Sequence, residues 1–231
     1  MRLYYDLHLH TALSPCADIS MTPNAIITEA ARIGLDVIAV TDHNCCGNAE
    51  AVMRAGKKAG ITVIPGMEVQ TPEGHIVTLF PDIQAAMRMQ EIIHSKIDFF
   101  KSDGNQLLFD EFDSIIGSYP DFLGCAAEMT TAEVIKAAKS LGGAAYPAHI
   151  DREYYGIIYN LGRIPPELEI SCVEITRAVA DADLYCEQYG IRSKYKTVRS
   201  SDAHHPSGIY QKPDHIEVSS REIECILQFL R

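Results

Sequence analysis

The sequence predicts an α/β fold in which parallel strands alternate with helices. Three observations support this prediction. Short apolar runs alternate with amphipathic segments of helical period at close spacing, which is typical of a parallel sheet. Residues that start and stop helices flank several of the amphipathic segments. Some apolar runs, such as residues 35–41, have no polar alternation, as expected for strands buried on both faces.

The first half of the chain carries the clearest alternation. A helix is expected to begin with Thr22 as its N-cap and Pro23 at its first position, and to stop at Gly34. A second helix is expected at residues 49–60. The strands predicted here occupy residues 3–7, 35–41, 61–69 and 75–80.

From residue 81 to about 130 the pattern changes to helical segments without clear strands, at residues 83–101 and 109–119. We interpret this stretch as a helical insertion within a single domain that spans residues 1–231. The alternation then resumes with a helix at 131–142, started by a capping box of Thr130 and Glu133, and Ser219 with Glu222 has the spacing that starts the last helix. Further strands are expected at residues 143–150, 170–176, 196–202 and 215–219.

Length and charge limit the classes of function. A chain of 231 residues has the size of one domain, and a hydrophobic content of 47% fits an ordinary globular protein. The net charge of −11 and the lack of a Lys/Arg run make nucleic acid an unlikely partner, so a small substrate is expected. Bound metal cations can invert the field inside a site, so an anionic substrate stays compatible with this charge.

Cysteines and hydropathy indicate the compartment. The chain starts without the apolar region of a signal peptide, and no apolar run approaches the roughly 18 residues of a membrane span. We therefore expect a cytoplasmic protein without a membrane segment. Its seven cysteines are expected to be free or metal-bound in a reducing environment.

Six histidines and two carboxylates follow predicted strands. A single histidine at a strand end is more often structural than functional, but this whole set falls at one kind of position. The His-x-His spacing of His8 and His10 also places both rings on one strand face, which suits metal chelation. The carboxyl ends of strands in a parallel barrel meet at one face, where such barrels build their sites. The set comprises His8, His10, His43, Glu68, His75, His149, Asp202 and His204.

These residues lie in the motifs DLHLHT, TDHN, GMEV followed by EGH, PAH and SDAH, and the set resembles the polymerase and histidinol phosphatase (PHP) superfamily. The motifs extend from Asp6 to His205, so the resemblance covers nearly the whole chain. It implies a distorted (β/α)7 barrel, similar to a TIM barrel, that holds two or three divalent metal ions and hydrolyses phosphoesters. Zinc, manganese or iron are the metals that we expect.

The resemblance also implies ligands for each ion. His8 and His10 would bind a first metal with Glu68 and Asp202. Glu68 would bridge to a second metal, which His75 and His149 also hold. His43 and His204 would bind a third. We expect the catalytic residues among these ligands: His8, His10, Glu68, Asp202 and His204.

The loop after the His-x-His pair usually supplies one more ligand in this family. Here the candidates are Cys16 and Asp18, and Cys16 is favoured because it stands where some members have a histidine. A buried structural cysteine is the alternative. A thiolate ligand would favour zinc or iron over magnesium.

Other residues near strand ends have weaker assignments. A phosphate substrate needs a cationic clamp, for which Arg177 and Arg199 are preferred over Arg152, and His205 is a candidate substrate contact. Asp6 and Asp42 are expected to orient ligand imidazoles. The sequence suggests no role for Glu174, and a structural or exposed position is expected for His94 and His215.

The ligand set predicts hydrolysis of a phosphoester, in a small phosphorylated metabolite or nucleotide, by a metal-activated hydroxide. No Ser/His/Asp arrangement and no Gly-rich phosphate loop offers another mechanism. The alternatives are a nuclease or proofreading phosphodiesterase, a non-catalytic metal-binding module, and a metallohydrolase that acts on amides.

Overall fold

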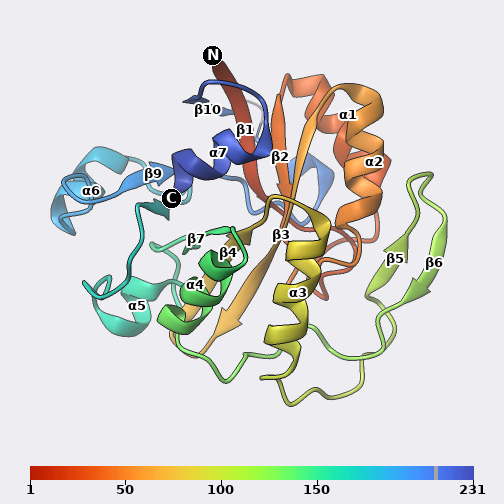
Figure 1. The fold of residues 1–231 in the computed structure, drawn as a ribbon, viewed down its shortest axis with the longest axis horizontal. Helices are drawn as coiled ribbons and strands as arrows, with labels where there is room; N and C mark the ends of the chain where they lie inside the picture. The colour runs from red at the N-terminus through yellow and green to blue at the C-terminus, as the bar shows by residue number, and fades with distance from the viewer. Residues whose placement is uncertain (211–212) are drawn as a thin grey trace.

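The computed structural model describes residues 1–210 and 213–231 (Figure 1). The helices are α1 (Pro23–Ile33), α2 (Ala49–Ala59), α3 (Ile83–His94), α4 (Thr131–Ser140), α5 (Ile157–Leu161), α6 (Ala182–Gln188) and α7 (Ile223–Leu230). The strands are β1 (Arg2–Leu9), β2 (Val37–Val40), β3 (Thr62–Thr71), β4 (Gly74–Leu79), β5 (Leu107–Phe109), β6 (Ile115–Ser118), β7 (Ala144–Pro147), β8 (Cys172–Glu174), β9 (Lys196–Val198) and β10 (Asp214–Glu217).

Six of the strands form one curled sheet in the order β10-β1-β2-β3-β4-β7. The pair β8–β9 continues the curl, because Ile150, just after β7, donates its backbone N–H to the carbonyl of Glu174 at 2.9 Å. After β9 the chain returns to β1, where the N–H of His10 donates to the carbonyl of Ala203 at 3.1 Å. The predicted α/β architecture, a distorted barrel, is confirmed.

The expectation of a purely parallel sheet is wrong for two strands. The pairs β1–β2 and β2–β3 are parallel, but β4 is antiparallel to both β3 and β7, and β10 is antiparallel to β1. Only the two residues Pro72 and Glu73 separate β3 from β4. A connection this short can join only antiparallel strands, since a parallel crossover needs a dozen or more residues.

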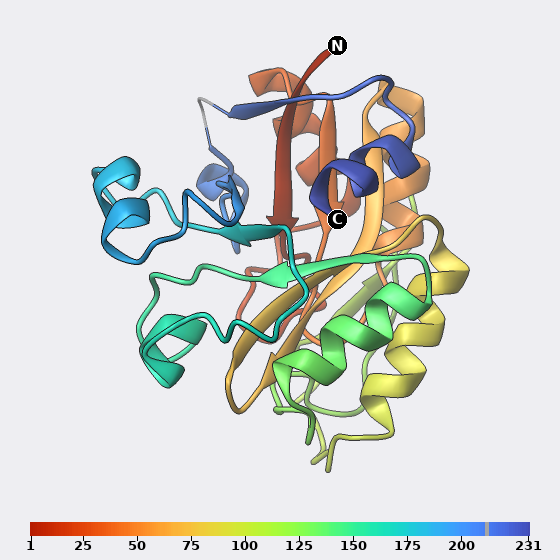
Figure 2. The ribbon, with the colours of Figure 1, turned by 60° about the vertical axis from the view of Figure 1, so that its left-hand side comes forward.

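The sheet has an apolar core on each face. In β2, Ile38 and Val40 pack in a core with α1, α2, α3 and α4, which lie along one face of the sheet (Figure 2). Val37 and Ala39 point the other way, into a second core that α7 closes with Ile226, Leu227 and Leu230. The first face is called here the α1–α4 face and the second the α7 face.

The predicted helix signals hold for α1 and α4. Thr22 caps α1 by accepting the N–H of Ala25, and Gly34 ends the helix with a φ of 81°. Thr130 and Glu133 form the expected capping box of α4. The predicted start of the last helix is wrong, because α7 begins at Ile223 and Ser219 donates to the sulfur of Cys225 instead of capping the helix.

The insertion is only partly helical. Helix α3 begins as predicted but ends at His94 instead of residue 101. Residues 109–119 form the end of β5, a turn and β6 (Figure 1). The carboxylate of Asp110 accepts the backbone N–H groups of Phe112 and Ser114, at 2.9 and 2.8 Å, and this fixes a turn where a helix was expected. The β-branched pair Ile115 and Ile116 then suits a strand better than a helix.

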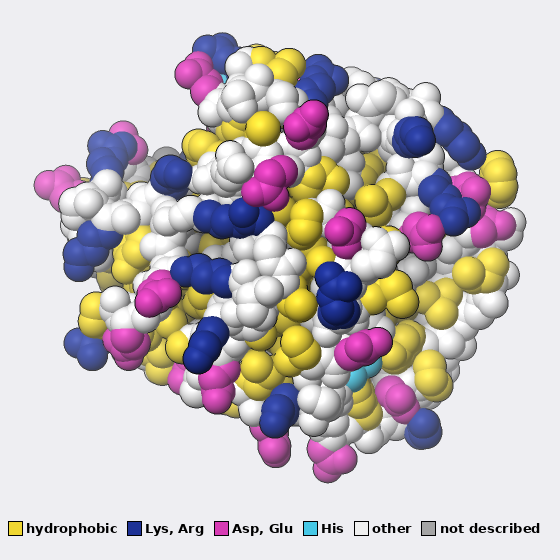
Figure 3. Space-filling view, in the orientation of Figure 1, with side chains coloured by type: hydrophobic (Ala, Val, Ile, Leu, Met, Phe, Trp, Pro, Cys, Tyr) yellow, Lys and Arg dark blue, Asp and Glu magenta, His cyan; other side chains and the backbone are white. Residues whose placement is uncertain are grey.

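Acidic and basic side chains are interspersed on the face drawn in Figure 3, which shows no continuous basic area. Within the described part of the chain, none of the helices has the length and apolar character needed to span a membrane.

Candidate metal centre

The predicted ligands gather at one end of the α7 face, and an irregularity in β1 brings the first two there. Leu3, Tyr5 and Leu7 lie in the core on the α7 face, so regular alternation would send His8 to the opposite face. The register of β1 against β2 shifts between Asp6 and Leu9, and Leu9 packs in the core on the α1–α4 face. His8 and His10 are thereby turned toward the α7 face, where both are fully buried.

The β3–β4 hairpin supplies the next two donors. Glu68 shares its strand face with Ile64, and His75 shares its face with Val77; both apolar residues lie in the core on the α7 face. Because β4 is antiparallel, its first residues lie at the same edge of the sheet as the last residues of β3. His75 therefore reaches Glu68 although it comes at the beginning of a strand, not at its end.

Two of the remaining predicted ligands have backbone conformations that are rare for residues other than glycine. His149 has a φ of 25° and Asp202 has a φ of 51°. Such conformations carry a local free-energy cost and concentrate at functional sites. Here they direct the two side chains toward Glu68 and His10.

Glu68 lies at the centre of the cluster and is 1% exposed. Its oxygens lie 3.3 and 3.4 Å from ring nitrogens of His10 and His8. The other three contacts are shorter, from 2.9 to 3.1 Å, and they involve His43, His75 and His149. Five histidines thus surround one buried carboxylate, an arrangement suited to a ligand that bridges metals.

The spacing within the first predicted group fits one metal ion. His8, His10, Glu68 and Asp202 offer donor atoms within 4.8 Å of one another. Their neighbouring donors lie 3.1–3.4 Å apart. Ligands at about 2.1 Å from a tetrahedral or octahedral ion are separated by roughly 3.0–3.4 Å, so these distances match a metal shell. Asp202 Oδ1 is buried without a hydrogen-bond donor, as expected for an oxygen that binds a cation.

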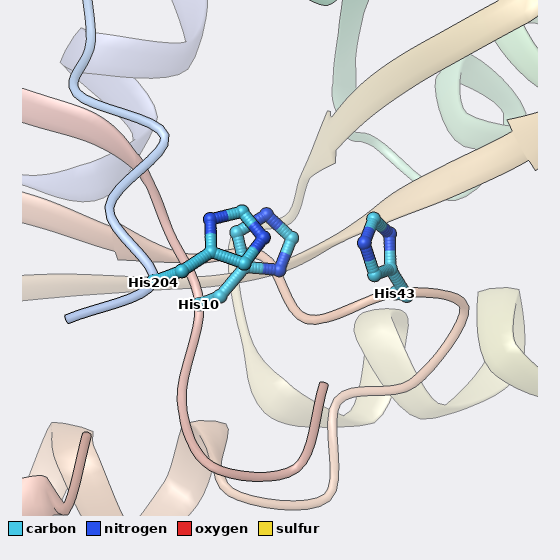
Figure 4. A group of neighbouring side chains, drawn as sticks. All are labelled: His10, His43 and His204. Carbon is cyan, nitrogen blue, oxygen red and sulfur yellow. The ribbon is translucent and has the colours of Figure 1, made fainter. Parts of the chain in front are cut away.

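Two further groups have the same character. His43, Glu68 and His75 offer close donors, and His149 contacts the same Glu68 oxygen as His75 at 2.9 Å. His10, His43 and His204 form the third group, in which the ring of His204 lies over that of His10 with centroids 4.2 Å apart (Figure 4). His43 is therefore positioned between the second and third predicted sites.

The loop ligand candidates differ in position. Cys16 lines the cavity beside the cluster, and its sulfur lies 3.1 Å from His204 Nε2. Asp18 is exposed and accepts the N–H and hydroxyl of Ser20 at 2.8 and 2.6 Å, which is a turn contact. The geometry favours Cys16, and its assignment as a ligand stays a prediction.

The pKa shifts in the cluster indicate which charges a bound cation would replace. Burial alone would lower the pKa of His10, but the carboxylates of Asp202 and Glu68 outweigh it and raise the pKa to about 9. Burial opposes the charge on Glu68 and Asp202, yet the surrounding imidazoles hold the pKa of both carboxyls below the usual range. Burial lowers the pKa of His43 and of His204 to about 4, so these rings present free lone pairs. A divalent ion would replace protons that now balance the two carboxylates.

Hydrogen bonds orient the rings of two predicted ligands. His8 Nδ1 lies 2.9 Å from Glu174 Oε1, which leaves Nε2 directed at the cluster. His10 Nδ1 lies 2.8 Å from Ser14 Oγ, and this hydroxyl donates to Asp42 at 2.7 Å. Such contacts fix the tautomer of a metal-binding imidazole. Sequence analysis found no role for Glu174 and missed Ser14, because neither lies in a motif with a metal-ligand spacing.

Asp6 contacts the backbone and not a ligand ring: it accepts the N–H of Ser201 at 3.0 Å. His94 is half-buried and contacts the carbonyl of Asn44 at 2.7 Å, a structural position.

A cavity of about 320 Å³ opens beside the ligands. Arg152 lines it and donates to Asp202 Oδ2 at 2.6 Å. The preferred clamp residues Arg177 and Arg199 do not line this cavity. Arg177 contacts Asp214 and lies over the ring of Tyr210, while Arg199 donates to the carbonyls of Thr176 and Val179. His205 is exposed and accepts the N–H of Ser207.

The chain is similar in sequence to several curated proteins. The 5'-3' exoribonuclease of Haemophilus influenzae is 32% identical over 101 residues, which cover 40% of this chain and 36% of that protein. The 3',5'-nucleoside bisphosphate phosphatase of Chromobacterium violaceum is 36% identical over 78 residues, which cover 32% of this chain and 26% of that protein. This chain thus spans less than two thirds of the length of either relative.

The fold is shared with solved structures. The lesion-specific endonuclease PfuEndoQ from Pyrococcus furiosus matches with a TM-score of 0.76 at 18% identity, over 100% of this chain and 56% of that chain. A structure of endonuclease Q in complex with a 27-mer duplex matches with a TM-score of 0.69, at 18% identity over 99% of this chain and 56% of that chain. At this level of identity the similarity concerns the fold.

These comparisons overturn the expectation that nucleic acid is an unlikely partner. One sequence relative is an exoribonuclease, and another solved chain with this fold holds duplex DNA. The expectation rested on the net charge of −11. Net charge is a sum over the whole surface, whereas the local field at a metal site determines whether a polyanion binds there.

The model of the PHP domain matches residues 6–141, which include five of the predicted ligands: His8, His10, His43, Glu68 and His75. The match covers more than half of the chain, and the remaining predicted ligands His149, Asp202 and His204 meet these five in the folded structure. The chain belongs to the PHP domain family.

Proposed function

We propose that the chain is a metal-dependent phosphoesterase that hydrolyses a phosphoester of a nucleotide, either free or within nucleic acid. The observation that carries the proposal is the buried carboxylate of Glu68 with five histidine rings within 3.4 Å. A purely structural metal site needs no open space, but this cluster borders a cavity of about 320 Å³.

The cluster would hold two or three divalent ions. His8, His10, Glu68 and Asp202 would bind the first, Glu68 with His75 and His149 the second, and His43 with His204 and Cys16 the third. Imidazole and thiolate donors favour zinc or iron, and carboxylates also accept manganese. When bound, such ions polarise a phosphoryl oxygen and lower the pKa of a water molecule, which supplies a nucleophile at neutral pH.

The chain's own residues position these parts. Glu174 holds the ring of His8, and Ser14 with Asp42 holds that of His10, so both Nε2 atoms face the cluster. Arg152 is the cation that borders the cavity, and its guanidinium suits a bidentate contact with phosphate. We assign the substrate clamp to Arg152 because it is adjacent to the cluster.

The names of the two reported relatives both refer to phosphoesters of nucleotides. A nucleoside bisphosphate phosphatase and an exoribonuclease both act, by their names, on phosphates of nucleotides. This likeness supports a nucleotide moiety over a sugar phosphate or an amino-acid phosphate.

A substrate panel tests the proposal. The purified chain is stripped with a chelator, reconstituted separately with zinc, manganese and iron, and assayed for phosphate release or strand cleavage. The panel contains adenosine 5'-monophosphate, adenosine 3',5'-bisphosphate, a 5'-phosphorylated single-stranded oligonucleotide and bis(4-nitrophenyl) phosphate. Activity should require added metal and should be lost in His10→Ala.

His215→Ala is the matched control. His215 is exposed on β10, where its ring contacts that of Tyr4, and it is not part of the cluster. Metal-reconstituted chain that cleaves nothing in this panel, or activity that survives complete metal removal, would contradict the proposal.

A further inference from the structure

Two aromatic residues line the same cavity as the predicted metal ligands and are not among those ligands. Phe122 comes from the segment between β6 and α4, and Tyr155 comes from the loop between β7 and α5. The cavity therefore combines metal donors, the guanidinium of Arg152 and two aromatic rings from segments far apart in the sequence.

The ring of Phe122 has a defined position. It stacks on Phe100 with centroids 4.8 Å apart and planes 21° apart, and its backbone N–H donates to the carbonyl of Phe100 at 2.8 Å. Gly124 allows this placement, since a Cβ at that position would lie 2.6 Å from Cε1 of Phe122. The local sequence thus leaves space for one particular ring orientation at the cavity wall.

Tyr155 is held beside a metal donor. Its carbonyl accepts the backbone N–H of His75 at 3.0 Å, and its ring centroid lies 4.9 Å from the ring of His75. The residue is still 50% exposed. A large ring that is anchored next to the site but not buried has a free surface for a ligand.

Three further aromatic residues, near these two in sequence or in ring contact, are largely exposed. Phe100, which stacks on Phe122, is 59% exposed. Tyr154, next to Tyr155, is 68% exposed and its ring lies 5.1 Å from that of Tyr159, which is 52% exposed. Single exposed apolar residues are ordinary, but Phe122 and Tyr155 both border one cavity, and two rings in such a place suit a flat ligand.

Polar groups for sugar hydroxyls are few in the cavity lining. Apart from the predicted ligands, the polar side chains of this lining are Gln70, Arg152 and the hydroxyl of Tyr155. The amide of Gln70 already contacts His43 Nδ1 at 3.1 Å, and Arg152 is assigned above to the phosphate. The lining is better suited to a flat heteroaromatic ring than to a bare sugar.

We propose that Phe122 and Tyr155 form a stacking site for a nucleobase, which presents the phosphate of a nucleoside phosphate to the metal centre. The inference rests on the proposed phosphoesterase function, and it adds the part of the substrate that is recognised. Every base has an aromatic face, so stacking of this kind selects nucleotides as a class without selecting one base.

Binding of a fluorescent nucleotide tests the site without requiring turnover. The probe is 2-aminopurine riboside 5'-monophosphate, whose emission is quenched when the base stacks, and the zinc-reconstituted chain contains no tryptophan to interfere. Phe122→Ala and Tyr155→Ala should each weaken binding about tenfold, as expected for the loss of one base–aromatic stack. Tyr155→Phe should bind like the original chain.

Further variants separate stacking from folding. Phe122→Leu keeps apolar volume without a flat ring and should lose affinity, while its circular dichroism spectrum and melting temperature stay unchanged. Phe112→Ala is the control: Phe112 is 70% exposed in the turn between β5 and β6, contacts Lys58, and does not line the cavity.

The proposal is overturned if the probe binds without quenching, if both alanine variants bind it normally, or if ribose 5-phosphate competes as well as adenosine 5'-monophosphate. Failure of the proposed function gives a different result: quenched, ring-dependent binding with no hydrolysis of any nucleotide. A hydrolysis rate that is unchanged in both alanine variants, and equal for substrates with and without a base, would support the phosphoesterase and reject the stacking site.

A second pair of probes distinguishes a mononucleotide ligand from a single-stranded oligonucleotide. Tighter binding of a 5'-phosphorylated deoxyadenosine octamer than of deoxyadenosine 5'-monophosphate, with loss in Phe100→Ala or Tyr159→Ala, assigns the site to single-stranded nucleic acid. Equal binding of both probes, unaffected by these two variants, assigns it to a mononucleotide.

Discussion

At the residue scale, substitution of Glu68 should disturb the cluster more than substitution of any other donor, because Glu68 contacts histidines of all three groups described above. Replacing it with glutamine keeps the shape but removes the charge that balances the surrounding imidazoles and bound cations. Glu68→Gln should reduce turnover by about a hundredfold or more, the scale seen for the loss of a key electrostatic stabiliser. Elemental analysis of the same preparation should show a lower metal content.

Glu217→Gln is the matched control for this variant. Glu217 lies exposed on β10, 3.8 Å from Arg2, and should leave both turnover and metal content unchanged. Near-normal activity of Glu68→Gln would remove the bridging role.

Cys16 gives a second prediction at this scale. Its sulfur lies 3.1 Å from His204 Nε2, so Cys16→Ala should lose about one metal ion per chain and stay folded. Asp18→Ala should keep all of its metal, because the Asp18 carboxylate contacts Ser20. The measurement is metal content by mass spectrometry after dialysis, and the opposite ranking of the two variants would make Asp18 the loop ligand.

At the element scale, the segment between β6 and α4 can hold the Phe122 ring in its position because Gly124 has no side chain that would collide with it. Gly124→Ala would put a methyl group 2.6 Å from the Phe122 ring and displace the ring from Phe100. Nucleotide affinity should fall nearly as far as in Phe122→Ala, with little change in melting temperature, since Gly124 is only partly buried.

Gly117→Ala is the control for this backbone change. A Cβ at Gly117 meets nothing within 4 Å, although the residue lies on β6 of the same insertion. An unaltered affinity in Gly124→Ala, measured by titration with 2-aminopurine riboside 5'-monophosphate, would show that the Phe122 position does not matter for binding.

The elements also show how far sequence reasoning reaches. Caps such as Thr22 and the Thr130–Glu133 pair act within one helical turn, so the sequence predicted them. The turn at Asp110 competes locally with a helix of similar composition, and the apolar periodicity of residues 109–119 did not reveal it. The irregularity in β1 depends on the partner strand, and no pattern within residues 2–9 shows it.

The site was predictable in part for the same reason. Imidazoles and carboxylates at strand ends identify themselves by residue type, and the structure brings the predicted set together. Glu174 and Ser14 act through single hydrogen bonds to ligand rings, and Phe122 acts through a ring stack. Such roles depend on three-dimensional contacts between distant segments, which residue type alone does not specify.

At the scale of the whole molecule, the candidate metal centre joins segments that the sheet pairs only in part. Its possible donors come from β1, β3, β4 and the segments after β1, β2, β7 and β9. Metal that binds only the folded chain should stabilise it by about 4 kcal/mol at a thousandfold excess over Kd, which is roughly 8–16 °C in Tm for a chain of this size.

Differential scanning fluorimetry with and without a chelator checks this prediction. His10→Ala should lose most of the metal-dependent shift, whereas His215→Ala should retain it. A melting temperature that is independent of metal would mean that the cluster does not bind ions in the folded state.

The β3–β4 hairpin has a consequence for the order in which the centre forms. Glu68 and His75 are seven residues apart and are diagonal neighbours across a hairpin, so their contact requires closure of only a short loop. Asp202 meets His10 across almost 200 residues, which is entropically more demanding and slower. A refolding chain therefore acquires a half-built chelate around Glu68 first, and ions present during refolding meet the second site before the first. In stopped-flow refolding with zinc, an early metal-binding phase should persist in Asp202→Asn and disappear in His75→Ala.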